Sequence, residues 1–107
     1  MAAPHHSPHV PALYATTYMM AVEAARALGY ALTIHGTLRR DLDLVAVPWT
    51  EEAASKEELL AAIQGIFPRV YDEARWEERA HGRQTVTITW EAGLYLDLSV
   101  MPRQAKA

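Results

Sequence analysis

Two aspartates, Asp41 and Asp43, lie one residue apart in a segment that otherwise reads as a buried strand, and Asp97 lies in a later apolar segment. An unpaired buried carboxylate is costly, so acidic side chains at such positions need a cation, a ligand or water beside them. Mg²⁺ and Mn²⁺ prefer carboxylate oxygens as ligands. We therefore predict a divalent metal site (Mg²⁺ or Mn²⁺) on these three aspartates, with salt bridges to neighbouring arginines as the structural alternative.

The elements that position these residues follow from the spacing of apolar residues. Residues 12–28 contain no internal proline or glycine and predict a helix. The capping box of Ser55 and Glu58 predicts a second amphipathic helix that stops before Pro68. Alternation of apolar and polar residues predicts four strands, and the last two read as an antiparallel hairpin. The strands are expected at 31–35, 41–48, 84–90 and 94–102.

If the apolar faces of these strands are turned together, the fold is α+β, a small mixed four-stranded sheet with two helices on one face, in the order α-β-β-α-β-β. The uncovered face then collects the three aspartates with His35 and other polar side chains, and the hairpin places Thr87 opposite Asp97. The charged stretch 69–83 is assigned no fixed structure, since a frayed helix, a long strand and a mobile flap all fit it. The domain is expected at 12–102, between flexible tails at 1–11 and 103–107.

Composition excludes several classes of protein. A chain of 107 residues, half of them apolar, makes one folded domain, and a net charge of −3 argues against bulk nucleic-acid binding. Cysteine is absent, so thiolate metal sites and disulfides are excluded. No apolar run has the length of a membrane span, and the first residues lack the order of a signal peptide, so a cytoplasmic location without membrane contact is expected.

The pattern around the acids resembles that of the polymerase-beta-like nucleotidyltransferase superfamily, particularly its minimal members. The matching residues are Gly36 and Thr37 at a strand end, Asp41 and Asp43 in the next strand, and Asp97 in a later one. In that family the three carboxylates bind two metal ions that carry a nucleoside triphosphate and help activate the attacking hydroxyl. The glycine and its hydroxyl neighbour contact the phosphates. The resemblance implies this nucleotidyltransferase-like fold and these roles here, over residues 32–100.

One segment departs from the family pattern. Only the four residues from Thr37 to Arg40 separate Gly36 from Asp41, and the family usually has a longer loop there. Arg39 and Arg40 are expected to supply positive charge for the phosphates in place of the missing backbone.

The sequence is also similar to short phage and prophage proteins of unassigned function that carry "HGSxxRDxDLVAxPW", "HGR" and "YxDLSxMP" stretches. This likeness adds His35, Arg40, His81 and Arg83 to the candidate site. Asp97 and His35 are the candidate catalytic residues, and His81 is read as a further proton carrier or phosphate contact. Residues 81–83 read equally well as an exposed turn.

Three classes of function stay open. In the first, the protein is a metal-dependent nucleotidyltransferase that transfers a nucleotide from a triphosphate to a hydroxyl acceptor. In the second, the same face of a phage-encoded module binds or sequesters a nucleotide or nucleotide-derived signal without turning it over. In the third, the uncovered sheet face is a structural interface. A homodimer or a partner protein fits each class. Trp49 reads as core or edge packing, or as a base-stacking platform.

Overall fold

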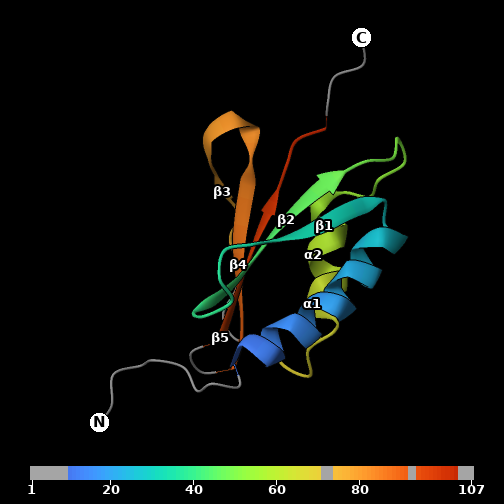
Figure 1. The fold of residues 1–107 in the computed structure, drawn as a ribbon. Helices are drawn as coiled ribbons and strands as arrows, with labels where there is room; N and C mark the ends of the chain where they lie inside the picture. Colours follow the sequence, from blue (N-terminus) through green and yellow to red (C-terminus); the bar gives the residue numbers. More distant parts are fainter. Residues whose placement is uncertain (1–9, 71–73, 92–93, 104–107) are drawn as a thin grey trace.

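The computed structural model describes residues 10–70, 74–91 and 94–103. Within them, two helices pack on one face of a five-stranded sheet, so the predicted α+β class is confirmed (Figure 1). In chain order the elements are α1 (Val10–Ala27), β1 (Tyr30–His35), β2 (Asp41–Pro48), α2 (Lys56–Gln64), β3 (Glu77–Glu78), the 3-10 turn η1 (Ala80–Gly82), β4 (Gln84–Glu91) and β5 (Leu94–Val100).

The strand order in the sheet is β1-β2-β5-β4-β3. Strands β2 and β5 are parallel neighbours, and every other neighbouring pair is antiparallel. The fifth strand, β3, was not expected: it lies in the charged stretch 69–83 and pairs only Glu77 with Thr85 and Glu78 with Gln84. The predicted hairpin is present as β4 and β5, and Thr87 is opposite Asp97 as predicted.

Alternating side chains divide the sheet into a helix-covered face and an open face. The covered face carries an apolar core to which every strand but β3 contributes, including Leu42 and Leu44 of β2, each at most 1% exposed. The residues that alternate with them, Asp41, Asp43 and Val45, point to the open face because side chains of a strand alternate. No helix among the described residues covers that face (Figure 1).

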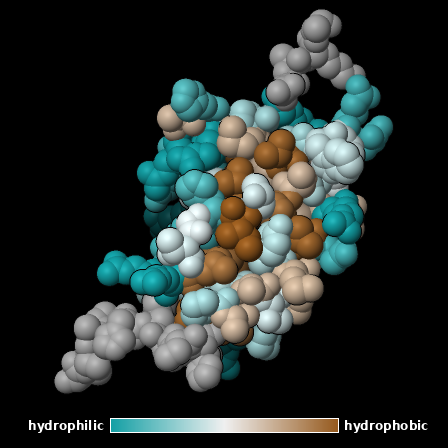
Figure 2. All heavy atoms as spheres, viewed as in Figure 1, coloured by the Kyte–Doolittle hydropathy of each residue, from teal (hydrophilic) through white to brown (hydrophobic). Residues whose placement is uncertain are grey.

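The open face is not uniformly polar. Val47, at the end of β2 remote from the acids, is 41% exposed. Figure 2 shows apolar side chains gathered over β1 and β2 in this view, with hydrophilic side chains on either side. The aspartates therefore occupy one end of the open face. Of the helices described, none combines the length and apolar character needed to cross a membrane.

The ends of the two helices can be compared with the ends predicted from local sequence. The capping box on α2 is formed as predicted: the Ser55 hydroxyl accepts from the Glu58 backbone N–H at 3.1 Å, and the Glu58 carboxylate accepts from the Ser55 N–H at 3.1 Å. Helix α1 begins at Val10, two residues before the expected domain start. Pro11 does not oppose this because proline is well tolerated in the first turn of a helix, and Val10 is buried against the core.

At the other end, Arg103 was expected in a flexible tail but is anchored. Its guanidinium donates to the backbone carbonyls of Glu51, Ala53 and Ala54, which lie in the segment before α2. A charge-assisted donor of this kind holds the end of the last strand to the segment that follows β2. The rest of the predicted tails, residues 1–9 and 104–107, lie outside the described residues.

Tyr14 of α1 connects the helical layer to both acid-bearing strands. Its side chain is fully buried, its hydroxyl donates to the Arg40 carbonyl at 2.6 Å, and the Tyr95 N–H donates back to it at 3.3 Å. Arg40 directly precedes β2, and Tyr95 is the second residue of β5. Burial raises the pKa of this phenol above its ordinary value, so the hydroxyl keeps its proton and can donate.

We expect Tyr14→Phe to destabilise the protein by about 1–3 kcal/mol, because it leaves the Arg40 carbonyl and the Tyr95 N–H without their partner. Urea unfolding followed by circular dichroism measures the loss. The matched control is Tyr18→Phe, which removes a single hydrogen bond, from the Tyr18 hydroxyl to the Leu32 carbonyl at 2.8 Å. An equal or larger loss in the control would show that Tyr14 has no special connecting role.

Candidate metal centre

Two of the three aspartates, Asp43 and Asp97, lie on one rung of the sheet. Across β1, β2, β5 and β4, His35 is paired with Asp43, Asp43 with Asp97, and Asp97 with Thr87. Each step along this rung is about 4.8 Å, the spacing of hydrogen-bonded strands. Because the Asp43–Asp97 step joins parallel strands in register, two carboxylates lie side by side in the middle of the sheet.

Asp41 completes the cluster from the same strand. It lies two residues before Asp43 and opposite Tyr95, so its side chain is on the same face. One carboxylate oxygen from each of Asp41, Asp43 and Asp97 lies within 4.8 Å of the others, and all three residues are partly buried. The structure thus brings together the three predicted metal ligands, although Asp43 and Asp97 are 54 positions apart in the sequence.

The donor set fits a hard divalent cation. With Mg–O distances near 2.1 Å, ligands on opposite sides of one Mg²⁺ are about 4.2 Å apart. Ligands in adjacent positions are closer, about 3.0 Å apart, so the observed separations of at most 4.8 Å must close by up to roughly 2 Å, which side-chain rotation can supply. All three donors are carboxylates, the ligand class that suits Mg²⁺ and Mn²⁺.

Crowding of negative charge is visible in the protonation of Asp43. Its pKa rises from an ordinary value of 3.8 to about 6, first because burial disfavours the charged form. A hydrogen bond with Asp97 and the charges of Asp97 and Asp41 raise the pKa in the same direction, and His35 acts against them. Asp43 thus keeps its proton to a higher pH than an isolated carboxyl does, and a cation would take the place of that proton.

The side chains beside Asp97 fix its orientation. The Thr87 hydroxyl donates to Asp97 Oδ1 at 2.6 Å. One rung further along β5, Ser99 is only 7% exposed and receives a hydrogen bond from the Arg83 guanidinium at 3.4 Å. Arg83, a predicted phosphate ligand, therefore reaches the same open face as the acids, two residues along the strand from Asp97.

The loop before Asp41 is tight and close to the cluster. Gly36 has φ +89°, and a Cβ on it would lie 3.1 Å from Asp43 Oδ2, so only glycine fits this approach without strain. The Thr37 hydroxyl accepts from the Arg39 N–H at 3.4 Å, and Leu38 adopts φ +65°. Arg39 is exposed, as is Arg40. The predicted phosphate-binding roles of these loop residues stay predictions.

His81 is not brought to the acids. It lies in η1 with φ +66° and an exposed side chain, at the end of β4 beyond Arg83. Six residues separate it from Thr87, so it lies up to about 20 Å away along the strand direction. This position agrees with the exposed-turn interpretation of residues 81–83, and a proton-carrying role for His81 at the acids has no geometric support.

Two groups of residues near the site were not predicted from the sequence. One is Tyr14, whose spacing in a helix indicated only core packing. The other is a pair of arginines, Arg75 and Arg79, which line a cleft with Thr87. They lie in the charged stretch 69–83, where no alternation of apolar residues indicated which face each side chain takes.

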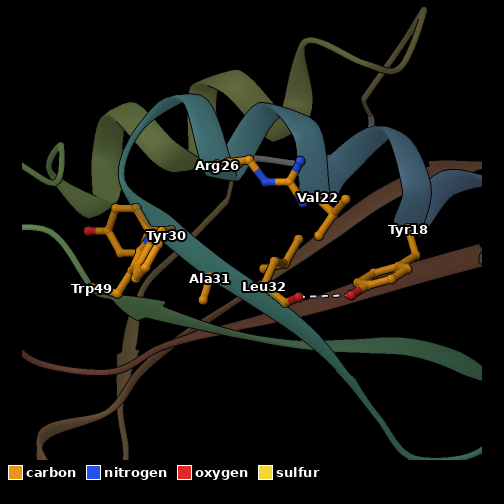
Figure 3. A pocket seen from close by; sticks show the side chains of 7 residues that line it. All are labelled: Tyr18, Val22, Arg26, Tyr30, Ala31, Leu32 and Trp49. Atoms are coloured by element: carbon orange, nitrogen blue, oxygen red, sulfur yellow. Dashed lines mark hydrogen bonds between the residues drawn. The ribbon is translucent and has the colours of Figure 1, made fainter.

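Another concavity lies away from the acids, between α1 and the free edge of β1 (Figure 3). Its volume is about 390 Å³, and the Tyr18 hydroxyl on the Leu32 carbonyl lies at one end while Tyr30 and Trp49 lie at the other. Trp49 is 68% exposed, so it is not core packing. Six residues separate it from Asp43, or about 20 Å along a strand, so it does not share the acidic site.

Comparisons with known proteins leave the site to be interpreted from its geometry. No model of a known protein family matches the chain, and no curated protein matches it.

We expect Asp43→Asn to stabilise the metal-free protein at pH 8 and not below pH 4. A carboxyl with a raised pKa binds its proton more tightly in the folded state, so the stability that its protonation contributes is present below pH 3.8 and lost as the pH rises through about 6. The variant removes this loss. After allowance for solvent screening, the gain at pH 8 is about 1 kcal/mol.

Thermal unfolding in EDTA at several pH values measures this difference. The control is Glu52→Gln, which removes an exposed carboxylate in the turn after β2 and should change stability little at any pH. A loss of more than about 2 kcal/mol in Asp43→Asn at pH 8 would instead identify Asp43 as a structural ion-pair partner.

Proposed function

We propose that the protein binds a nucleotide or nucleotide-derived ligand through Mg²⁺ or Mn²⁺ held by Asp41, Asp43 and Asp97, and that it acts as a small nucleotidyltransferase. The observation that carries this proposal is the parallel, in-register pairing of β2 with β5, which puts three carboxylate oxygens within 4.8 Å on an uncovered sheet face. Like charges directly side by side destabilise a sheet. A cluster kept at that cost fits a site for a cation.

The surroundings of the cluster support the same proposal. Gly36 approaches Asp43 without a side chain of its own, and this leaves more room for a phosphate group there than any other residue would. Arg39 and Arg40 precede Asp41, and Arg83 reaches Ser99, so positive charge is available on both sides of the acids. Such guanidinium groups form charge-assisted hydrogen bonds to phosphate oxygens.

Each residue then has a defined task in nucleotide transfer. Asp41, Asp43 and Asp97 would hold the metal ions, which would neutralise the triphosphate and lower the pKa of the acceptor hydroxyl. Asp97 takes the proton of that hydroxyl, whose oxygen forms the bond to the α-phosphorus while pyrophosphate leaves. Thr87 keeps Asp97 oriented through its 2.6 Å hydrogen bond, and His35 lies beside Asp43 on the same rung.

A non-catalytic nucleotide binder is the second candidate, and one observation favours it. The loop from Thr37 to Arg40 offers little backbone for cradling a triphosphate, and its last carbonyl is already bound by Tyr14. A ligand with fewer phosphates, held but not turned over, fits this short loop. The same metal centre serves both candidates.

The first test is metal binding. Mg²⁺ or Mn²⁺ at one hundred times its dissociation constant should stabilise the protein by about 2.7 kcal/mol, since it binds the native state alone. A domain of this size then melts roughly 10 °C higher. Asp41→Asn and Asp97→Asn should each abolish the rise, and Glu52→Gln should keep it. Metal stabilisation that survives in both aspartate variants would rule out the site.

The second test separates an enzyme from a binder. The Mn²⁺-loaded protein is incubated with α-³²P-labelled nucleoside triphosphates and total cellular RNA or protein, and label transfer and pyrophosphate are measured. A transferase gives both products, and Asp97→Asn gives neither. Retention of labelled nucleotide without pyrophosphate identifies the binder. If no nucleotide is retained in the presence of metal, both candidates fail.

A further inference from the structure

A cleft beside the acids has no role in the function proposed above. It lies between β4 and the segment 75–79 and has a volume of about 240 Å³. We call it the basic cleft. Its lining residues are Arg75, Glu77, Arg79, Thr85, Val86, Thr87 and Thr89.

Both arginines belong to the open face of the sheet. Trp76 packs against the core, and the Lys56 ammonium of α2 lies 5.1 Å from its ring centre, so Trp76 points toward the helices. Its neighbours Arg75 and Glu77 then point the other way, because side chains alternate in extended backbone. Glu77 lies opposite Thr85, whose hydroxyl is 3.4 Å from that of Ser99 on the open face.

The basic cleft and the acidic cluster share a side chain. Thr87 lines the cleft and also donates to Asp97. The cleft therefore begins where the rung of His35, Asp43, Asp97 and Thr87 ends, at Thr87 on β4. At two strand spacings, the backbone at Arg75 lies about 10 Å from that at Asp97.

The chemistry of the lining suits one phosphate group. Two guanidinium groups and the hydroxyls of Thr85 and Thr89 can donate hydrogen bonds to phosphate oxygens, whereas the one proton of the Thr87 hydroxyl is already donated to Asp97. Glu77 opposes this, but it is occupied by Arg79 in a 2.8 Å ion pair. Arg75 has no ion pair within the described residues, so its guanidinium is the group most available to an anion.

We infer that the basic cleft binds a phosphate group of the acceptor substrate. The acceptor would then be a phosphorylated molecule whose reacting hydroxyl lies at Asp97 and whose phosphate lies at Arg75, about 10 Å away. The assignment of the acceptor rests on the proposed function, whereas binding of phosphate in the cleft does not. An internucleotide phosphate of a nucleic-acid end and the phosphate of a small metabolite share this chemistry.

The test is an NMR titration of ¹⁵N-labelled full-length protein in EDTA, so that no metal can hold the phosphate. The probes are adenosine 5′-monophosphate, a tetraribonucleotide without terminal phosphate, and adenosine as the uncharged control. We expect the amide signals of Thr85, Thr87 and Thr89 to move with at least one phosphate-bearing probe and not with adenosine. The probe that binds more tightly identifies the source of the phosphate.

Two variants with opposite expected effects separate recognition from folding. Arg75→Gln should weaken phosphate binding about tenfold or more, the loss of a charge-assisted hydrogen bond. Glu77→Gln should tighten it a few-fold, because it removes a repelling carboxylate and releases Arg79. Both variants should keep the full rise in melting temperature with Mg²⁺, which tests the metal centre separately.

The inference would be overturned by no movement of the threonine signals with either phosphate probe, by equal movement with adenosine, by unchanged affinity in Arg75→Gln, or by weaker binding in Glu77→Gln. Loss of the Mg²⁺ effect in Arg75→Gln would also overturn it, since Arg75 would then act on the acids. If the wild-type protein shows no Mg²⁺ effect but binds phosphate through Arg75, the proposed function is wrong and the assignment of a phosphate site to the basic cleft stands.

Discussion

The central constraint on this fold is that two carboxylates, those of Asp43 and Asp97, lie side by side on the parallel strands β2 and β5. A one-residue change of register would separate them, but it would also turn Leu42 and Leu44, both fully buried, to solvent. The apolar side chains that form the core thus also force the acids together. The raised pKa of Asp43 is the electrostatic consequence of that packing.

Residues next to this pair reduce the electrostatic repulsion between the two carboxylates without removing their charge. Thr87 donates to Asp97 from one side, and His35 lies beside Asp43 on the other. Tyr14 holds the starts of both strands through one buried hydroxyl. None of these groups is a cation bonded to the Asp43–Asp97 pair, and the salt bridges found in the described residues all lie elsewhere. Salt-bridged structural carboxylates, the plain alternative at the sequence level, therefore fit Asp43 and Asp97 poorly.

Much of this arrangement could be predicted from sequence wherever apolar residues alternate over a long segment. Seven residues of β5 with a turn before them determined the hairpin and the Thr87–Asp97 contact, and the faces of β1 and β2 followed in the same way. The convergence of the three aspartates was predicted and is observed. The basic cleft was not, because β3 is two glutamates long and has no periodicity to read. Arg103 and Pro11 were assigned to flexible tails for a related reason. The contacts of Arg103 depend on tertiary structure, and Pro11 fits the helix only because of its position in the first turn.

The long connection between β2 and β5 determines when the acidic cluster can form during synthesis and folding. Asp43 and Asp97 are separated by 54 residues of chain, including α2, β3 and β4, and closing so long a loop is entropically slow. A nascent polypeptide would leave the ribosome with the first two acids exposed to solvent well before the third is synthesised. The three-carboxylate arrangement is therefore a property of the finished fold, and it arises only when the last strand inserts between its neighbours.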